Sequence, residues 1–192
     1  MSRCRTSRNE DGYTLIELIA GVAIMATLAG IAVGQMLASI DHSRGYAAAK
    51  YLGNRLGLAR IQAVARATAI GLRFDNDARG ITFSVFQDGN GNGVRSADIQ
   101  DGTDPLVEKP TRLFEHFPGV AIGLTPGSPG SDPVQIGPTN LLTFTPSGTA
   151  TSGTIYIRDR EGTQWAVRVL GATGRTRVLR YDARTKGWIA AQ

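Results

Sequence analysis

Cysteine is nearly absent from the 192-residue sequence, because Cys4, close to the N-terminus, is the only one. A single cysteine excludes an intramolecular disulfide, a zinc site built from cysteines and a catalytic thiol in the body of the chain. Histidine is almost as scarce, and neither His42 nor His116 has a second ligand at a metal-binding spacing. The sequence also has no Walker A loop. We therefore expect a protein that is not an enzyme and that carries no obligatory cofactor.

Charged residues are also few, at 19% of the chain, while hydrophobic residues make up 42%. This balance excludes both a disordered polyampholyte and a protein with many membrane spans. Glycine is abundant, with 24 residues and no three-residue period, so we expect many tight turns and a substantial amount of β-structure.

The bases and acids are separated along the chain. Residues 42–73 hold six bases and no acid, residues 74–132 hold nine acids and four bases, and residues 158–192 hold eight bases and three acids. The sequence therefore has a basic C-terminal arm, which the net charge of +5 does not reveal.

The longest uncharged stretch runs from Leu18 to Ile40 and contains 23 residues. As a helix it would reach about 35 Å, which is enough to cross a hydrocarbon core of about 30 Å. A buried core helix is one alternative, but it would normally show a polar face. A cleavable secretory signal is another, but its apolar region is usually only about 7–15 residues long. We therefore predict a membrane span, whose orientation the flanking bases do not determine.

Beyond this stretch, helical spacing gives way to the alternation that is typical of strands. The helix is expected to continue to about Thr68, with a solvated stripe formed by Arg44, Arg55 and Arg66. A glycine- and proline-rich loop is expected at residues 123–138. The fold class is therefore α+β, with a long N-terminal helix packed on antiparallel sheet. The apolar stripe of the helix comprises Ala48, Leu52, Leu56, Ala59, Ala63 and Ala67, and strands are predicted at residues 70–74, 81–86, 141–144, 154–157, 165–169 and 177–181.

The segment Gly12-Tyr13-Thr14-Leu15-Ile16-Glu17 follows a polar leader with three arginines and opens the apolar run. Thr14 and Glu17 form a T-x-x-E capping box, which alone would explain an acid at a helix start. A capping box does not explain an acid at the edge of a membrane-spanning helix. The whole segment closely resembles the prepilin signal of type IV pilins and type II secretion pseudopilins. This resemblance implies cleavage after Gly12, N-methylation of Tyr13, and pairing of Glu17 with the Tyr13 amine of a neighbouring subunit.

The same resemblance implies a type IV pilin-like fold and a division of the chain into three parts. Residues 1–12 would be the leader peptide, residues 13–40 the transmembrane and filament-core half of the helix, and residues 41–192 the globular domain. The expected partners are prepilin peptidase, which is also the N-methyltransferase, and other pilins or pseudopilins. The expected location is the inner membrane, with a single span and the C-terminal domain in the periplasm, followed by the filament.

The remainder of the chain resembles the GspH/FimT group through residues 59–63, residues 144–148 and Gly174-Arg175-Thr176-Arg177. In the FimT branch, a Gly-Arg-x-Arg motif is implicated in DNA uptake by type IV pili. The resemblance therefore implies a minor pilin at or near the tip of a type IV pilus, with DNA as a partner. The alternative is a GspH-type pseudopilin with a structural role in type II protein secretion and no DNA binding.

The motif also makes physical sense for binding phosphate. Gly174 lets the chain turn, and Arg175 and Arg177, two apart on a strand, project from one face with forked donors, whereas Arg180 falls on the other face. A solvated basic edge that prevents strand aggregation is an equal alternative. The candidate DNA-binding residues are Gly174, Arg175, Arg177, Arg180, Arg184 and Lys186.

The segment Asp88-Gly-Asn-Gly-Asn-Gly93 places oxygen side chains at alternate positions, as a calcium loop does. The acid that should close such a loop is missing, because Ile99 stands at its position. A turn stabilised by Asx side chains is the favoured explanation. The calcium alternative would use Asp88, Asn90, Asn92 and Asp98.

Overall fold

The computed structural model describes residues 12 and 14–191, with side chains for residues 12, 14–31 and 43–191. The chain divides into two compact units, Met1–Ser39 and Ile40–Gln192. Helix α1 (Leu15–Ala65) begins in the first unit and continues into the second. It ends where Ala67 takes a positive φ of 50°, a left-handed conformation that stops a helix, so α1 stops slightly before the predicted Thr68.

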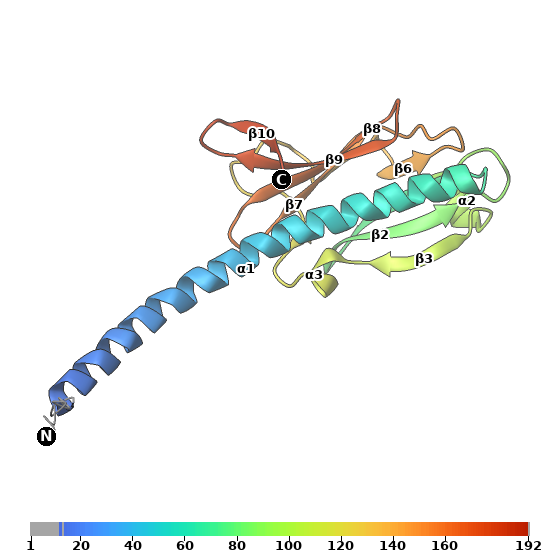
Figure 1. Cartoon of the computed structure of the whole chain (residues 1–192). Coiled ribbons are helices and arrows are strands. Elements are labelled where there is room, and N and C mark those ends of the chain that lie inside the picture. The colour runs from blue at the N-terminus through green and yellow to red at the C-terminus, as the bar shows by residue number, and fades with distance from the viewer. Residues whose placement is uncertain (1–11, 13, 192) are drawn as a thin grey trace, which may run out of the picture. The chain divides into compact units, whose positions relative to one another are not determined.

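The second unit contains two antiparallel sheets. In Figure 1, β2 and β3 of the first sheet lie below α1, and β8, β9 and β10 of the second lie above it. Sheet A has the strand order β3-β2-β1-β6, and sheet B has the order β10-β9-β8-β7-β4, with β5 also paired to β7. The α+β fold class is thereby confirmed. The elements after α1 are β1 (Ile70–Asp77), β2 (Gly80–Gln87), α2 (Ser96–Asp101), β3 (Leu106–Thr111), α3 (Leu113–His116), β4 (Ala121–Ile122), β5 (Val134–Gln135), β6 (Leu141–Phe144), β7 (Gly153–Arg158), β8 (Gln164–Leu170), β9 (Arg175–Asp182) and β10 (Gly187–Ala190).

The core of the second unit lies between α1 and the inner faces of the two sheets. Five positions of the predicted apolar stripe, Ala48, Leu52, Leu56, Ala59 and Ala63, are buried, whereas Ala67 is exposed because α1 has already ended. Small residues of α1 allow a close approach to sheet B. A Cβ on Gly45 would lie 2.6 Å from Nε1 of Trp165 in β8, and one on Gly53 would lie 3.5 Å from Val178 in β9.

The predicted solvated stripe of α1 arginines is wrong in part. Arg55 forms an ion pair with Glu108 of β3, a strand that the sequence analysis did not predict. Nη1 of Arg66 donates a hydrogen bond of 3.1 Å to the side-chain oxygen of Gln87. These arginines therefore connect α1 to sheet A, because β3 and the end of β2 lie beside the helix (Figure 1).

The segment between β2 and β3 covers part of the outer face of sheet A. Val94 packs above Gly71 of β1, where an added Cβ would lie 2.8 Å from Cγ1 of Val94. Leu141, Phe86 and Ile99 complete this small second core. Because the absence of a side chain at Gly71 leaves room for Val94, the loop can lie flat against the sheet.

Candidate functional site

The capping box at the start of α1 forms as predicted. The backbone N–H and the hydroxyl of Thr14 donate to Oε2 of Glu17 at 3.0 and 2.9 Å, and the N–H of Glu17 donates to the Thr14 hydroxyl at 3.4 Å. These bonds satisfy donors that the first helical turn would otherwise leave unpaired. Gly12 is exposed, and Tyr13 lies outside the described residues. The cleavage, methylation and pairing roles of Gly12, Tyr13 and Glu17 stay predictions.

The first unit exposes a continuous apolar surface. Every large apolar side chain from Leu15 to Ile31 is more than half exposed, from 56% for Ile19 to 77% for Leu15. An exposed surface of this size indicates contact with a membrane or with another protein.

Within the part of the chain that the structure describes, no helix combines the length and the apolar character that a membrane crossing requires. The span predicted at residues 13–40 stays a prediction.

Gly174 lies in the turn between β8 and β9, where three parts of the second unit meet. Its φ is +60°, and an added Cβ would lie 2.4 Å from the carbonyl oxygen of Gly148 and 2.8 Å from Nε of Arg60. That same Nε donates a 3.0 Å hydrogen bond to the Gly148 carbonyl. Glycine is therefore required here both by backbone conformation and by close contact with α1 and the turn after β6.

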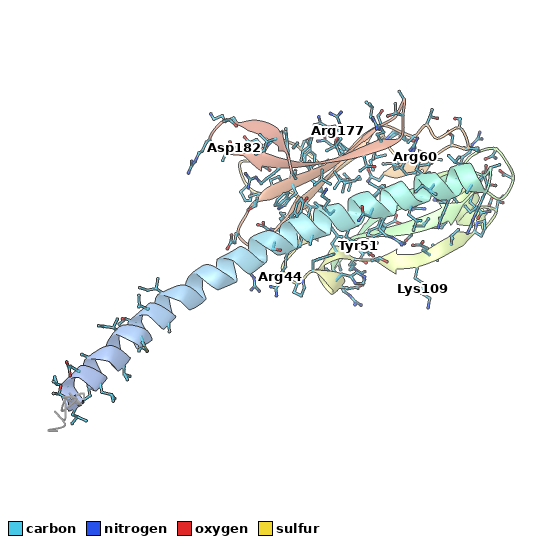
Figure 2. The ribbon with its side chains drawn as sticks, viewed as in Figure 1. Arg44, Tyr51, Arg60, Lys109, Arg177 and Asp182 are labelled. Carbon is cyan, nitrogen blue, oxygen red and sulfur yellow. The ribbon has the colours of Figure 1, made fainter. Side chains whose placement is uncertain are left out.

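Arg175 and Arg177 are both exposed and lie on the outer face of sheet B, opposite to the face that α1 covers. Arg177 is the cross-strand partner of Arg168 in β8, so that two like charges face each other directly. Figure 2 shows Arg177 on sheet B and Arg60 on α1. By alternation, the described positions on this outer face include Arg158 and no acid.

The remaining candidates are not brought to this face. Arg180 points to the inner side of β9, where it is the partner of Trp165. Arg184 and Lys186 are exposed in the turn between β9 and β10. The six residues therefore occupy four places: the turn before β9, its outer face, its inner face and the turn after it. The sequence did not indicate Arg168, because strand register cannot be read from a single strand.

Asp182, at the end of β9, stabilises the turn that carries Arg184 (Figure 2). Its carboxylate accepts the backbone N–H of Arg184 at 3.0 Å and the hydroxyl of Thr185 at 3.1 Å. These two bonds, aided by the charges of Arg184 and Arg180, hold the pKa of Asp182 below its ordinary value.

In the candidate calcium loop, Asp88 and Asp104 bind backbone groups, whereas Oδ2 of Asp98 accepts a 3.3 Å hydrogen bond from the side-chain amide of Asn90. The carboxylate of Asp88 is buried and accepts the N–H groups of Asn90, Gly91 and Gly93 at 3.1, 2.7 and 2.8 Å. Asp104 is also buried and accepts two further N–H groups. Among the described residues, no group of three or more His, Cys, Asp or Glu side chains is arranged to hold a metal ion. The contacts are those of an Asx-stabilised turn, and the calcium alternative stays a prediction.

Comparison with known proteins gives two family matches. A model described as type II transport protein GspH matches residues 48–174, and one described as the prokaryotic N-terminal methylation motif matches residues 7–33. No curated protein matches the chain.

Two solved structures of the minor pseudopilin EpsH from the type II secretion system of Vibrio cholerae are similar to the chain. The identities are 19% and 20%, both matches cover 71% of this chain and 97% and 93% of the other, and both TM-scores are 0.47. The GspH match covers 127 of the 192 residues, and the chain therefore belongs to the GspH family of type II transport proteins, which are type IV pilin-like.

Proposed function

We propose that the chain is a minor pseudopilin of a type II secretion system, with a structural role in the assembly of the pseudopilus. The proposal rests on the exposure of all nine large apolar side chains between Leu15 and Ile31, in a chain of the GspH family. Leaving such a surface in water is unfavourable by about 25 cal/mol for each Å². A membrane before assembly and neighbouring helices afterwards would both remove it from water.

In this function the N-terminal segment is processed before assembly. Prepilin peptidase removes residues 1–12 by cleavage after Gly12 and methylates the new amine of Tyr13. The chain is held in the inner membrane by a single span within residues 13–40, with its globular domain in the periplasm. The methylation-motif match over residues 7–33 supports this order of events.

The role of Glu17 follows from the cost of placing a carboxylate in an apolar environment. Within one chain, Glu17 contacts only neutral groups of Thr14 among the described residues. A carboxylate beside lipid needs a positive charge to offset its desolvation. The Tyr13 amine of an adjacent subunit supplies that charge. The carboxylate of Glu17 is therefore stabilised only when its chain lies beside another subunit in the filament.

Two substitutions separate this role from helix capping. Glu17→Gln keeps the capping geometry, because glutamine also serves at this position, but it removes the charge. Thr14→Ala removes the capping hydroxyl and keeps the charge. In cells that carry a type II secretion system, we expect Glu17→Gln to lower crosslinking of the mature chain to other pseudopilins by at least about tenfold and Thr14→Ala to leave it nearly unchanged.

Mass spectrometry of the same preparations checks processing. Both variants are expected to begin at a methylated Tyr13, since neither changes Gly12. Normal assembly of Glu17→Gln would contradict the charge-pairing role. A mature chain that retains residues 1–12 would contradict the proposed function itself.

DNA binding is a second candidate, favoured by the acid-free outer face of sheet B. Arg168 and Arg177 oppose each other there without a described counter-charge, and Arg175 lies on the same face. An anion bound between them would remove their repulsion. The family match favours the secretion function, which is the alternative of the sequence analysis, over the FimT-like function in DNA uptake.

A further inference from the structure

A groove of about 600 Å³ lies in the second unit between α1 and the C-terminal edge of sheet B. This volume is in the range of sites for small ligands. One wall is the part of α1 that carries Tyr46, and the opposite wall is formed by Trp165, Arg180 and β10. The other lining residues in the described part of the chain are Ser43, Ile189, Ala190 and Ala191.

The cation of the groove is Arg180. It is partly buried, with Trp165 as its cross-strand partner on one side and Ile189 on the other. Among the described residues, its guanidinium makes no hydrogen bond or ion pair, and its one recorded interaction is a charge effect on Asp182. The oxygens of Asp182 already accept the Arg184 N–H and the Thr185 hydroxyl. The forked donors of Arg180 are therefore available to an external anion.

Apart from Ser43, the other described residues of the lining are apolar or aromatic. The rings of Tyr46 and Trp165 lie 5.7 Å apart, and Nζ of Lys50 lies 5.4 Å from the centre of the Tyr46 ring. Ile189 is 39% exposed although it faces the groove. A ligand that fits this lining has an anionic end for Arg180 and an apolar part for Tyr46 and Ile189.

The sequence places the groove next to the predicted membrane span. Ser43 follows Ile40, the last residue of the uncharged stretch, by three positions, and three residues reach at most about 11 Å. The polar headgroup layer adds about 5–8 Å to each side of the hydrocarbon core. Tyr and Trp are also enriched at this depth. At this depth, a phospholipid is the molecule that offers both an anionic group and an apolar part.

We propose that the groove holds the headgroup of an anionic phospholipid, with its phosphate at Arg180 and its glycerol end against Tyr46 and Ile189. This inference rests on the proposed membrane anchoring. The bound lipid steadies the globular domain at the bilayer surface until the subunit enters the filament, which it cannot do without releasing the lipid.

The test uses the full chain with Trp188→Phe, so that Trp165 in the groove is the single tryptophan that reports. Trp188 contacts Tyr156 and Tyr181 on the outer face of sheet B, away from the groove. The chain is reconstituted into nanodiscs of phosphatidylcholine with increasing phosphatidylglycerol. We expect a saturable change in Trp165 fluorescence with phosphatidylglycerol and none with phosphatidylcholine alone.

Matched substitutions on β9 assign the effect. Arg180→Gln is expected to weaken the apparent affinity by about tenfold or more, and Arg180→Lys to restore most of it. Arg175→Gln removes the same charge from the outer face of the same strand and is expected to change nothing. Equal responses to the two lipids, or an unchanged affinity in Arg180→Gln, would overturn the proposal.

Soluble competitors distinguish the lipid from other anions. Glycerol phosphate and poly-glutamate are added as competitors of the fluorescence change caused by phosphatidylglycerol. If either one abolishes that change as effectively as phosphatidylglycerol produces it, the groove binds a free phosphate or an acidic protein segment, and the lipid assignment is overturned. The anchoring is tested separately, because a chain that fails to fractionate with membranes contradicts the proposed function. A chain that inserts into both kinds of nanodisc without lipid selectivity contradicts only the groove.

Discussion

At the scale of single residues, Gly174 shows how one position of a candidate binding motif is fixed by the fold. The sequence predicts a turn at this position, and the φ of +60° agrees with a turn. The contact with Arg60 and the Gly148 carbonyl could not be foreseen, because both partners are distant in the sequence. The glycine of the Gly-Arg-x-Arg segment is therefore needed for folding whether or not the arginines bind a ligand.

Replacing Gly174 by alanine is expected to destabilise the chain by about 1–3 kcal/mol, because alanine at this φ is strained and its Cβ meets a backbone oxygen. Gly57→Ala is the matched control. Gly57 is helical, and an added Cβ there has no neighbour within 4 Å, so the control should be neutral or stabilise by up to about 1 kcal/mol. Urea denaturation of the full chain in detergent measures both. Equal midpoints for the two variants would refute the close contact at Gly174.

At the scale of elements, the turn between β1 and β2 is joined to the segment before α3 through Asp77. Its carboxylate accepts the N–H of Arg79 at 2.8 Å and pairs with Arg112, which also contacts Glu115 at 3.4 Å. The Arg79 N–H first, and then the hydrogen bond and charge of Arg112, keep the pKa of Asp77 below its ordinary value. The pairing likewise raises the pKa of Arg112.

This lowered pKa gives a pH dependence with a definite sign. A carboxyl whose pKa is lower in the folded chain stabilises it above the unfolded pKa of about 3.9, and the contribution is lost as the pH falls through the folded value. At pH 7 the wild type should therefore have a higher melting temperature than Asp77→Asn, and the difference should shrink as the pH falls below the unfolded pKa. Thermal melts across a pH series check it, with Glu161→Gln, which removes an exposed acid elsewhere in the second unit, as a control. A difference that grows toward acid would contradict the assignment.

The elements also show which structure is readable from sequence. The six predicted strands are confirmed. Each is rich in apolar, β-branched or aromatic residues, although Leu141–Phe144 and others do not alternate strictly. Strand β3 was missed because Pro110 and mostly exposed side chains hide the alternation, and β10 has only four residues. Helix α2 lies in a segment that composition marks as a turn. Its anchor, Val94 above Gly71, depends on tertiary contact and leaves no local signal.

At the scale of the whole molecule, the acidic and basic segments of the sequence are distributed over different surfaces and contacts of the second unit. Several acids of residues 74–132 bind groups of the same molecule. Asp88 and Asp104 accept backbone N–H groups of their loop, and Glu108 forms an ion pair with Arg55. The basic C-terminal arm does not become one site. The net charge of a sequence segment predicts whether that segment is acidic or basic. Which charged side chains face each other depends on strand register, and for this reason Arg168 was not predicted beside Arg177.

The outer face of sheet B gives the prediction at this scale. If it binds DNA, full-length chain in detergent should bind duplex DNA with a steep salt dependence. Arg175→Gln with Arg177→Gln should then lower the log-log slope by about 0.9 for each lost phosphate contact. The control is Arg79→Gln with Lys109→Gln, which removes two exposed charges elsewhere in the second unit (Figure 2 shows Lys109). Identical slopes in both double variants would assign the arginines to solubility.

Val94 and α2 cover part of the outer face of sheet A, and this affects how two copies of the chain can contact each other. A bare sheet surface invites sheet-on-sheet stacking between molecules, and here the chain occupies part of that surface with its own loop. Under the proposed function, two copies crowded in a bilayer would meet a covered side of sheet A and an arginine-bearing side of sheet B whose like charges repel. Under that function, this arrangement favours assembly through contacts between helices over contacts between sheet faces.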